Sequence, residues 1–171
     1  MSQADHGVKT WQVLAQHEAA QGNWYDAVED LSQSLGLLPL AARKERADIL
    51  ALRGRYSLLN HAYNAAREDW AQALSLAPKE PAIIRSLARL HLLGPPEHRD
   101  PHTALGLIAG SAADPNPNPE DLMILGIAQV RLGRYEQGLS TLEKVADSPT
   151  TRPHTARAIV GSEVRSTGPT F

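Results

Sequence analysis

The stretch from Leu122 to Lys144, LMILGIAQVRLGRYEQGLSTLEK, constrains the fold more than any other part of this 171-residue chain. Apolar residues recur in it at spacings of one, three and four, which place them on one face of a helix. Gly133 and Arg134 interrupt this pattern, and it resumes near Tyr135. The stretch therefore predicts two helices joined by a tight turn.

The rest of the chain repeats this unit, with approximate boundaries at residues 8–41, 42–80, 81–118 and 119–152. Small and bulky residues fall at matching places in each unit, so that each pair of helices can approach closely and bury one face against its neighbours. The first helices carry a small residue at Ala15, Gly54, Ala88 and Gly126. The second helices carry one at Ala27, Ala66, Ala104 and Gly138, followed by the bulky Leu31, Trp70, Ile108 and Leu142.

The first unit also matches a known repeat pattern, W-x2-L-G followed by A-x3-F and a closing proline. The matching residues are Trp11, Leu14, Ala15, Ala27, Leu31 and Pro39. The chain thus resembles the tetratricopeptide repeat (TPR) family, although Arg53 stands where the second repeat should have leucine. The resemblance implies an all-α, right-handed α-solenoid of about four helix-turn-helix repeats. They would form one domain over residues 1–171, closed by a capping helix at 153–166.

Two local features complete the expected fold. Asp100 before Pro101 predicts a helix N-cap followed by proline in the first turn, where its missing N–H has no helical partner. The acid pairs Glu29–Asp30 and Glu68–Asp69 lie on second helices, and we interpret them as solvated outer faces. A charge introduced at Ala66 or Gly126 should unfold at least part of the array, because it would be buried without a partner.

In TPR proteins the first helices line a concave groove, and the resemblance therefore suggests a binding surface. Arginine recurs along it, and guanidinium groups match carboxylates in two-point geometry, which favours an acidic peptide as ligand. Alternatively, these arginines are simply solvated. Met123, Ile124 and Ile127 form an apolar wall that marks an interface, unless the terminal helix or a second copy covers it. The expected partner-binding residues are Gln16, Arg55, Arg85, Arg89, Met123, Ile127 and Arg131, and the same count places Leu59 and Leu93 in the groove.

Composition excludes several other classes of protein. The formal net charge is −2 and cysteine is absent, so we expect neither a nucleic-acid ligand nor disulfides or thiolate metal sites. No apolar run approaches the roughly 20 residues of a membrane-spanning helix, and the N-terminus is polar. These features predict a soluble, cytoplasmic protein without membrane insertion.

We find no pattern that indicates catalysis or a cofactor. His98 and His102 lie with Glu97 and Asp100 in a turn broken by prolines, not on one helical face, and so do not predict a metal site. No glycine-rich phosphate loop follows a strand. We therefore expect a non-enzymatic protein–protein interaction module, such as an adaptor, scaffold or chaperone. The alternatives are an interaction segment of a larger multidomain regulator and a self-assembling homo-oligomeric scaffold.

Overall fold

The structure, a computed structural model, describes residues 3–146. Within this range the chain is all-α, with eight α-helices, one short 3-10 helix and no strand. The expected capping helix at 153–166 lies outside the described residues. The elements are α1 (Gln3–Ala20), α2 (Trp24–Leu37), α3 (Arg43–Leu59), α4 (Tyr63–Leu76), α5 (Pro81–Leu93), η1 (Pro96–His98), α6 (Pro101–Ala112), α7 (Pro119–Arg131) and α8 (Tyr135–Ala146).

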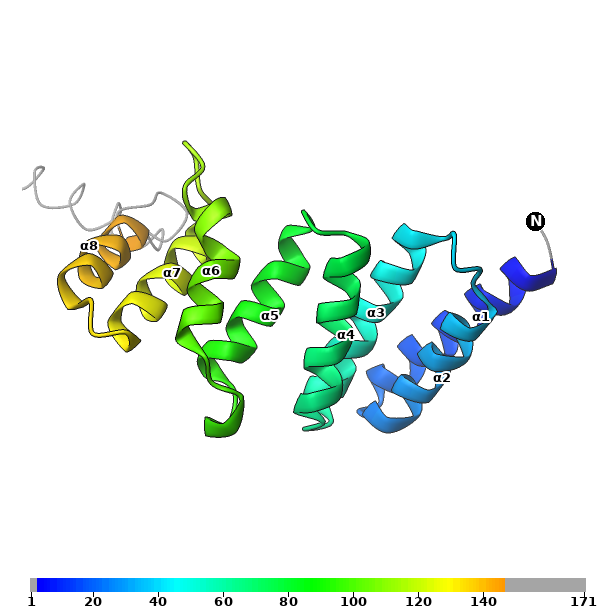
Figure 1. Ribbon diagram of the computed structural model, residues 1–171. Coiled ribbons are helices and arrows are strands. Elements are labelled where there is room, and N and C mark those ends of the chain that lie inside the picture. The colour runs from blue at the N-terminus through cyan, green and yellow to red at the C-terminus, as the bar shows by residue number, and fades with distance from the viewer. Residues whose placement is uncertain (1–2, 147–171) are drawn as a thin grey trace, which may run out of the picture.

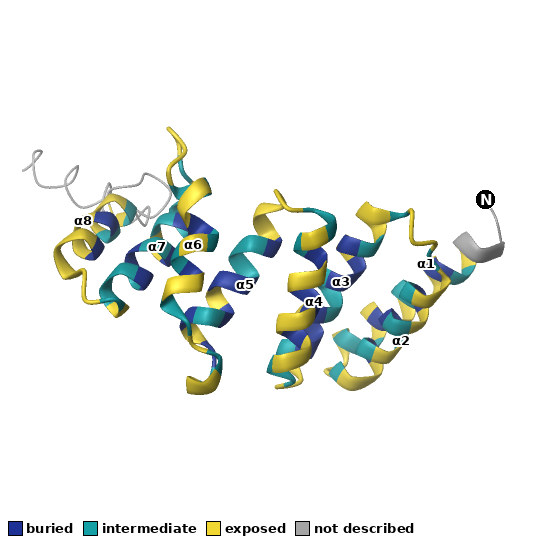
Figure 2. Ribbon diagram, in the orientation of Figure 1, coloured by how far each residue is buried: buried dark blue, intermediate teal, exposed yellow. Residues whose placement is uncertain are grey.

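The helices follow one another along an elongated row, from α1 at the N-terminal end to α8 at the other (Figure 1). The most extensive contacts join α1 to α2, α3 to α4, and α7 to α8, and α5 also contacts α7. Figure 2 shows buried residues where helices face one another and exposed residues along their outward sides. The core is therefore built mainly from contacts between helices that are close in the sequence.

The small residues that define the repeats lie at the closest helix contacts. All five alanines of the two small-residue sets are 0% exposed, and their three glycine counterparts are buried. A Cβ atom at Gly126 would lie 2.6 Å from Leu142 Cγ, and one at Gly138 would lie 2.5 Å from Val130 Cγ2. Because neither contact leaves room for a methyl group, α7 and α8 can pack this closely only with glycine at both positions.

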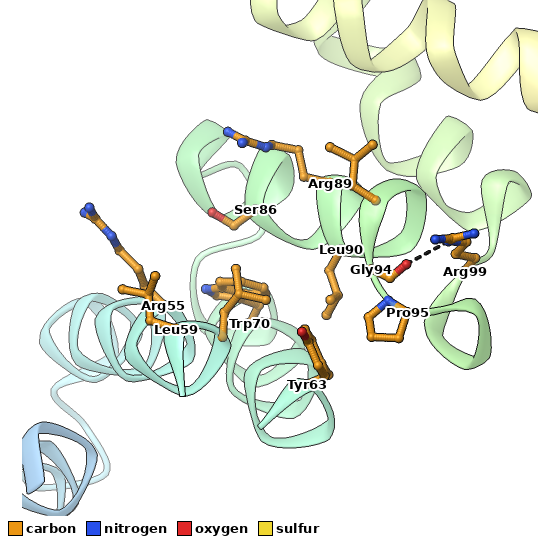
Figure 3. A pocket seen from close by; sticks show the side chains of 12 residues that line it. Arg55, Leu59, Tyr63, Trp70, Ser86, Arg89, Leu90, Gly94, Pro95 and Arg99 are labelled. Carbon is orange, nitrogen blue, oxygen red and sulfur yellow. Dashed lines mark hydrogen bonds between the residues drawn. The ribbon is translucent and has the colours of Figure 1, made fainter. Parts of the chain in front are cut away.

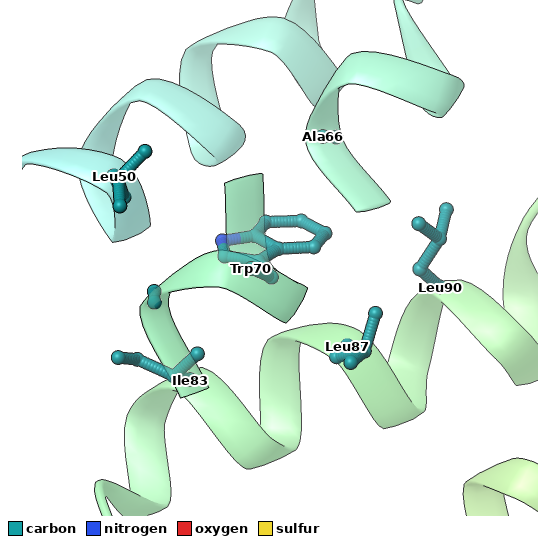
Figure 4. Close-up of a cluster of buried hydrophobic side chains, with 7 residues drawn as sticks. Leu50, Ala66, Trp70, Ile83, Leu87 and Leu90 are labelled. Atoms are coloured by element: carbon teal, nitrogen blue, oxygen red, sulfur yellow. The ribbon is translucent and has the colours of Figure 1, made fainter. Parts of the chain in front are cut away.

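Trp70 is the centre of the core of the middle repeats (Figure 4). Its indole packs in a cluster of α3, α4 and α5 side chains that includes Leu50, Ile83 and Leu87. The indole Nε1 donates a hydrogen bond of 3.1 Å to the carbonyl oxygen of Ala51, so its one polar group is satisfied. The cluster joins the second helix of one repeat to the first helix of the next. Neither repeat could bury these apolar side chains alone.

Three of the turns between paired helices have the same backbone design. The middle residue has a positive φ: 83° at Gly22, 59° at His61 and 77° at Gly133. The residue after it donates a backbone hydrogen bond to a carbonyl five positions earlier, as from Ala62 to Ser57 at 2.8 Å. This arrangement satisfies carbonyls left free at the helix end and suits glycine, which has no Cβ to clash. His61 is the exception to this preference.

Replacing His61 should therefore change stability according to the backbone preference of the new residue. We expect His61→Gly to raise the free energy of unfolding by up to about 1 kcal/mol, because the strained φ costs roughly 1–2 kcal/mol. The loss of the 3.1 Å contact between His61 Nδ1 and the Tyr63 hydroxyl offsets part of this gain. His61→Val should lower the same quantity by about 1–2 kcal/mol. Urea denaturation of both variants measures the difference, and equal stability would contradict the strain argument.

The N-terminal ends of the helices show which sequence signals were sufficient to predict where a helix begins. Asp100 caps α6 as predicted, since its carboxylate accepts 3.1 Å hydrogen bonds from the amides of His102 and Thr103. Hydrogen bonds from the hydroxyl and amide of Thr103 lower the pKa of Asp100. The stability that this cap contributes is therefore fully present above the ordinary carboxyl pKa, and it is lost as the pH falls through the lowered pKa of Asp100 in the folded protein. By contrast, α1 begins at Gln3 rather than near Val8, because apolar periodicity marks only the part of a helix that packs.

The interpretation of Asp69 as part of a solvated outer face is wrong. Asp69 is only 4% exposed, and Arg53 holds its carboxylate with two hydrogen bonds, of 3.0 Å from Nε and 2.6 Å from Nη2. Arg53 Nη1 also donates to Ser32 Oγ at 3.1 Å. The arginine that departs from the repeat pattern is thus compensated by an acid on the next helix, and it links α2, α3 and α4.

Candidate functional site

A cavity of about 740 Å³ opens between α3, α4, α5 and the segment that follows α5 (Figure 3). It lies between the first helices of the second and third repeats. The segment after α5 forms one wall because the third repeat has a longer turn than the others, with η1 inside it. The lining residues are Arg55, Leu58, Leu59, Tyr63, Trp70, Ser86, Arg89, Leu90, Leu93, Gly94, Pro95 and Arg99.

The cavity joins an apolar interior to an exposed apolar rim. Trp70 and Leu90 belong to the middle core cluster, and Tyr63 packs against it. On the rim, Leu59 is 41% exposed and Leu93 is 55% exposed. Large aliphatic side chains exposed on both sides of an aromatic base would gain from burial under a ligand.

All charged side chains that line the cavity are cationic. Arg55, Arg89 and Arg99 contribute guanidinium groups, and no Asp or Glu occurs among the described lining residues. Arg99 Nε donates a 2.7 Å hydrogen bond to the carbonyl oxygen of Gly94, which holds this arginine against the end of α5. Arg55 is exposed and makes no ion pair within residues 3–146. The cavity therefore presents positive charge beside apolar surface.

The structure brings together two of the seven residues that the sequence predicted for the site. Arg55 and Arg89 both line the cavity, and in Figure 3 their guanidinium groups lie on the same side of it, beyond Trp70. Leu59 and Leu93, which the same count placed in the groove, line it as well. The others lie outside the cavity: Gln16, Met123 and Arg131 are exposed, and Arg85 and Ile127 are partly buried.

Arg85 and Arg89 already have acidic partners within the chain. Glu120 Oε1 lies 3.0 Å from Arg89 Nη1, and Glu120 Oε2 lies 3.5 Å from Arg85 Nε. Asp121 Oδ1 lies 3.2 Å from Arg85 Nη1. Glu120 and Asp121 lie in the first turn of α7, where the helix dipole favours negative charge. Arg85, with a side chain only 21% exposed, thus joins α5 to α7 instead of standing free for a ligand.

The predicted apolar wall on α7 is only partly correct. Ile124 is 1% exposed and packs in a core cluster with Ala88, Leu92 and Ile108. Met123, its neighbour, remains exposed. Met123 and Ile124 are consecutive in the helix and therefore point in different directions, so the two side chains cannot both face the same groove.

The sequence did not identify the aromatic base or the far wall of the cavity. The sequence predicted only a packing role for Trp70, and it predicted no binding role for Tyr63 or for the turn after α5. The unusual length of this turn was the signal in the sequence, because the turn brings Gly94, Pro95 and Arg99 to the cavity. Tyr63 and His98 lie with ring centroids 5.8 Å apart, which places this turn against the start of α4.

A second, smaller hollow of about 340 Å³ lies on α1. It is lined by His6, Lys9, Thr10, Val13 and Leu14. Val13 and Leu14 are both exposed. Leu14 corresponds to Leu87, which is buried in the cluster around Trp70, whereas Leu14 is 40% exposed.

Among residues 3–146, no three or more His, Cys, Asp or Glu side chains gather where a metal ion could bind. None of the described helices is both long and apolar enough to cross a membrane. No protein-family model matches the sequence, and neither does any curated protein.

Proposed function

We propose that this chain is a TPR-like, right-handed α-solenoid that acts as a non-catalytic protein-interaction module. The repeated burial of small residues at matching positions supports this proposal, as do the three equivalent turns. Pairs of helices that each cover the next are typical of repeat proteins, which use extended surfaces to hold other proteins. The role would be that of an adaptor, scaffold or chaperone.

The observation that carries the proposal is the composition of the 740 Å³ cavity. It combines exposed leucines, an aromatic base and arginines on two successive repeats. Aromatic residues and arginine are enriched where proteins bind one another, since both gain from contacts that exclude water. We therefore propose that the protein-binding surface lies over α3 and α5.

Affinity capture from an extract of the native cells tests this proposal. We expect the immobilised wild-type chain to retain a protein that Leu93→Glu fails to retain, because the new carboxylate would enter the apolar rim of the cavity. Leu40→Glu is the matched control, because Leu40 is 82% exposed and does not line the cavity. Circular dichroism should show the same helix content in all three proteins.

Equal retention by both variants would place the binding surface elsewhere on the chain. Retention of nothing but the chain itself would support the competing function, self-assembly, for which the exposed Val13 and Leu14 on α1 are the specific observation. Light scattering during size-exclusion chromatography distinguishes these cases. A self-assembled species should revert to monomer in Leu14→Glu.

A further inference from the structure

Two successive repeats present the same pair of side chains at the cavity. Arg55 and Leu59 lie one helical turn apart on α3, and Arg89 and Leu93 lie one turn apart on α5. Residues four positions apart share a helix face. All four side chains line the same cavity. The surface therefore offers one cation beside one exposed leucine, and then offers the same combination again.

The chain itself supplies a carboxylate to one of these cations. Glu120 accepts a 3.0 Å hydrogen bond from Arg89, and both side chains are open to water, Arg89 at 54% and Glu120 at 37% exposure. Exposed ion pairs of this kind are weak and exchange readily with other partners. Arg55, at the equivalent position on α3, has no such partner among the described residues.

We propose that the paired sites Arg55–Leu59 and Arg89–Leu93 bind an acidic peptide segment with large apolar side chains, and that its carboxylates compete with Glu120 for Arg89. This inference rests on the proposed interaction function and specifies its ligand. Each guanidinium group would meet a carboxylate, and each leucine would be covered by an apolar side chain of the same peptide. Glu120 lowers the affinity for that peptide because it occupies Arg89 in the free protein.

Charge and shape both favour this ligand. A basic segment would meet three arginines with no acidic group among the described lining residues. A long polyanion such as nucleic acid would gain contacts at the arginines, but the net charge of −2 opposes extended binding over the rest of the surface. A short peptide that carries both acidic and apolar groups matches the cations and leucines together.

Selection from a library of random peptides, about twelve residues long, against the immobilised chain tests the ligand class. We expect enrichment of sequences that combine Asp or Glu with Leu, Ile, Met or Phe. Fluorescence anisotropy then measures the affinity of one selected peptide for each variant. Arg55→Glu should weaken binding about tenfold or more, through repulsion of the peptide carboxylates. Glu120→Gln should tighten binding roughly two- to fivefold, the size expected for release of an exposed ion pair.

Two matched variants control for changes in overall charge. Arg67 on α4 and Glu136 on α8 are exposed and do not line the cavity, so Arg67→Glu and Glu136→Gln should leave the affinity unchanged. A gain of affinity in Glu120→Gln cannot arise from misfolding, which would weaken binding. The tightening should also shrink at high salt, where ion pairs are screened.

The possible failures are distinguishable. Enrichment of peptides without acidic residues would overturn the inference while leaving a peptide-binding function in place. Equal affinities of wild type and Glu120→Gln for an acidic peptide would disprove the competition. Failure to select any peptide, with the helical fold intact, would count against both the proposed function and this inference.

Discussion

Ala66→Asp should abolish cooperative folding of the middle of the chain. Ala66 is 0% exposed and packs in the cluster around Trp70, where three helices meet. A carboxylate at this position would be buried without a cation or a hydrogen-bond donor, at a cost of several kcal/mol. Since domains of this size are stable by only about 5–15 kcal/mol, we expect a large loss of helical circular dichroism at 25 °C.

The adjacent alanine provides the control for this experiment. Ala65 is exposed on the same helix, so Ala65→Asp should change the free energy of unfolding by less than about 0.5 kcal/mol. Gly126→Glu, on α7 near the C-terminal end of the row, should resemble Ala66→Asp, because even a Cβ atom there would meet Leu142. A melting temperature unchanged in both Ala66→Asp and Gly126→Glu would show that the repeat register is wrong.

Arg53→Leu should also strongly destabilise the protein, although leucine is the residue that the repeat pattern leads one to expect. The substitution leaves the buried Asp69 carboxylate without its two hydrogen bonds from Arg53. Breaking a buried ion pair by removing one partner costs about 3–5 kcal/mol. Urea denaturation followed by circular dichroism measures this cost. As a control, Lys44→Leu removes the exposed pair with Asp48 and should cost less than about 1 kcal/mol.

The double variant Arg53→Leu with Asp69→Leu should recover most of the lost stability. The third repeat carries Leu87 and Leu107 at the corresponding positions, and both pack in the middle core. Replacing a buried ion pair by apolar residues of similar volume is often neutral or stabilising. If the double variant were as unstable as Arg53→Leu alone, the loss would come from Arg53 itself, for example from its contact with Ser32.

Helix positions and the buried small residues could be predicted because they depend on local rules. Apolar periodicity, the proline after a helix start and the glycine in a turn act within a few residues of one another. The expected turn at Gly133 and the cap at Asp100 are both present. The predicted small residues are buried, since each repeat imposes the same steric limit at the same place.

The partners of charged side chains could not be predicted in this way. Arg53 and Asp69 lie on different helices, as do Arg89 and Glu120. Their pairing depends on which turn of one helix faces which turn of the next. Counting along the first helices predicted Arg55 and Arg89 in the groove, and both line the cavity. The same count could not show that Glu120 already pairs with Arg89.

An all-helical fold over residues 3–146, the order of its helix pairs and the small residues on which they pack follow from the amino-acid sequence alone, because the pattern of side-chain size and polarity repeats along the chain. The tertiary arrangement was needed to show which charges are buried, which of Arg55 and Arg89 has an acidic partner, and where the long turn after α5 lies. These features depend on distances between helices that are remote in sequence. A carboxylate about 3 Å from a guanidinium group pairs with it, whereas a guanidinium group without a carboxylate at that distance can still bind a ligand.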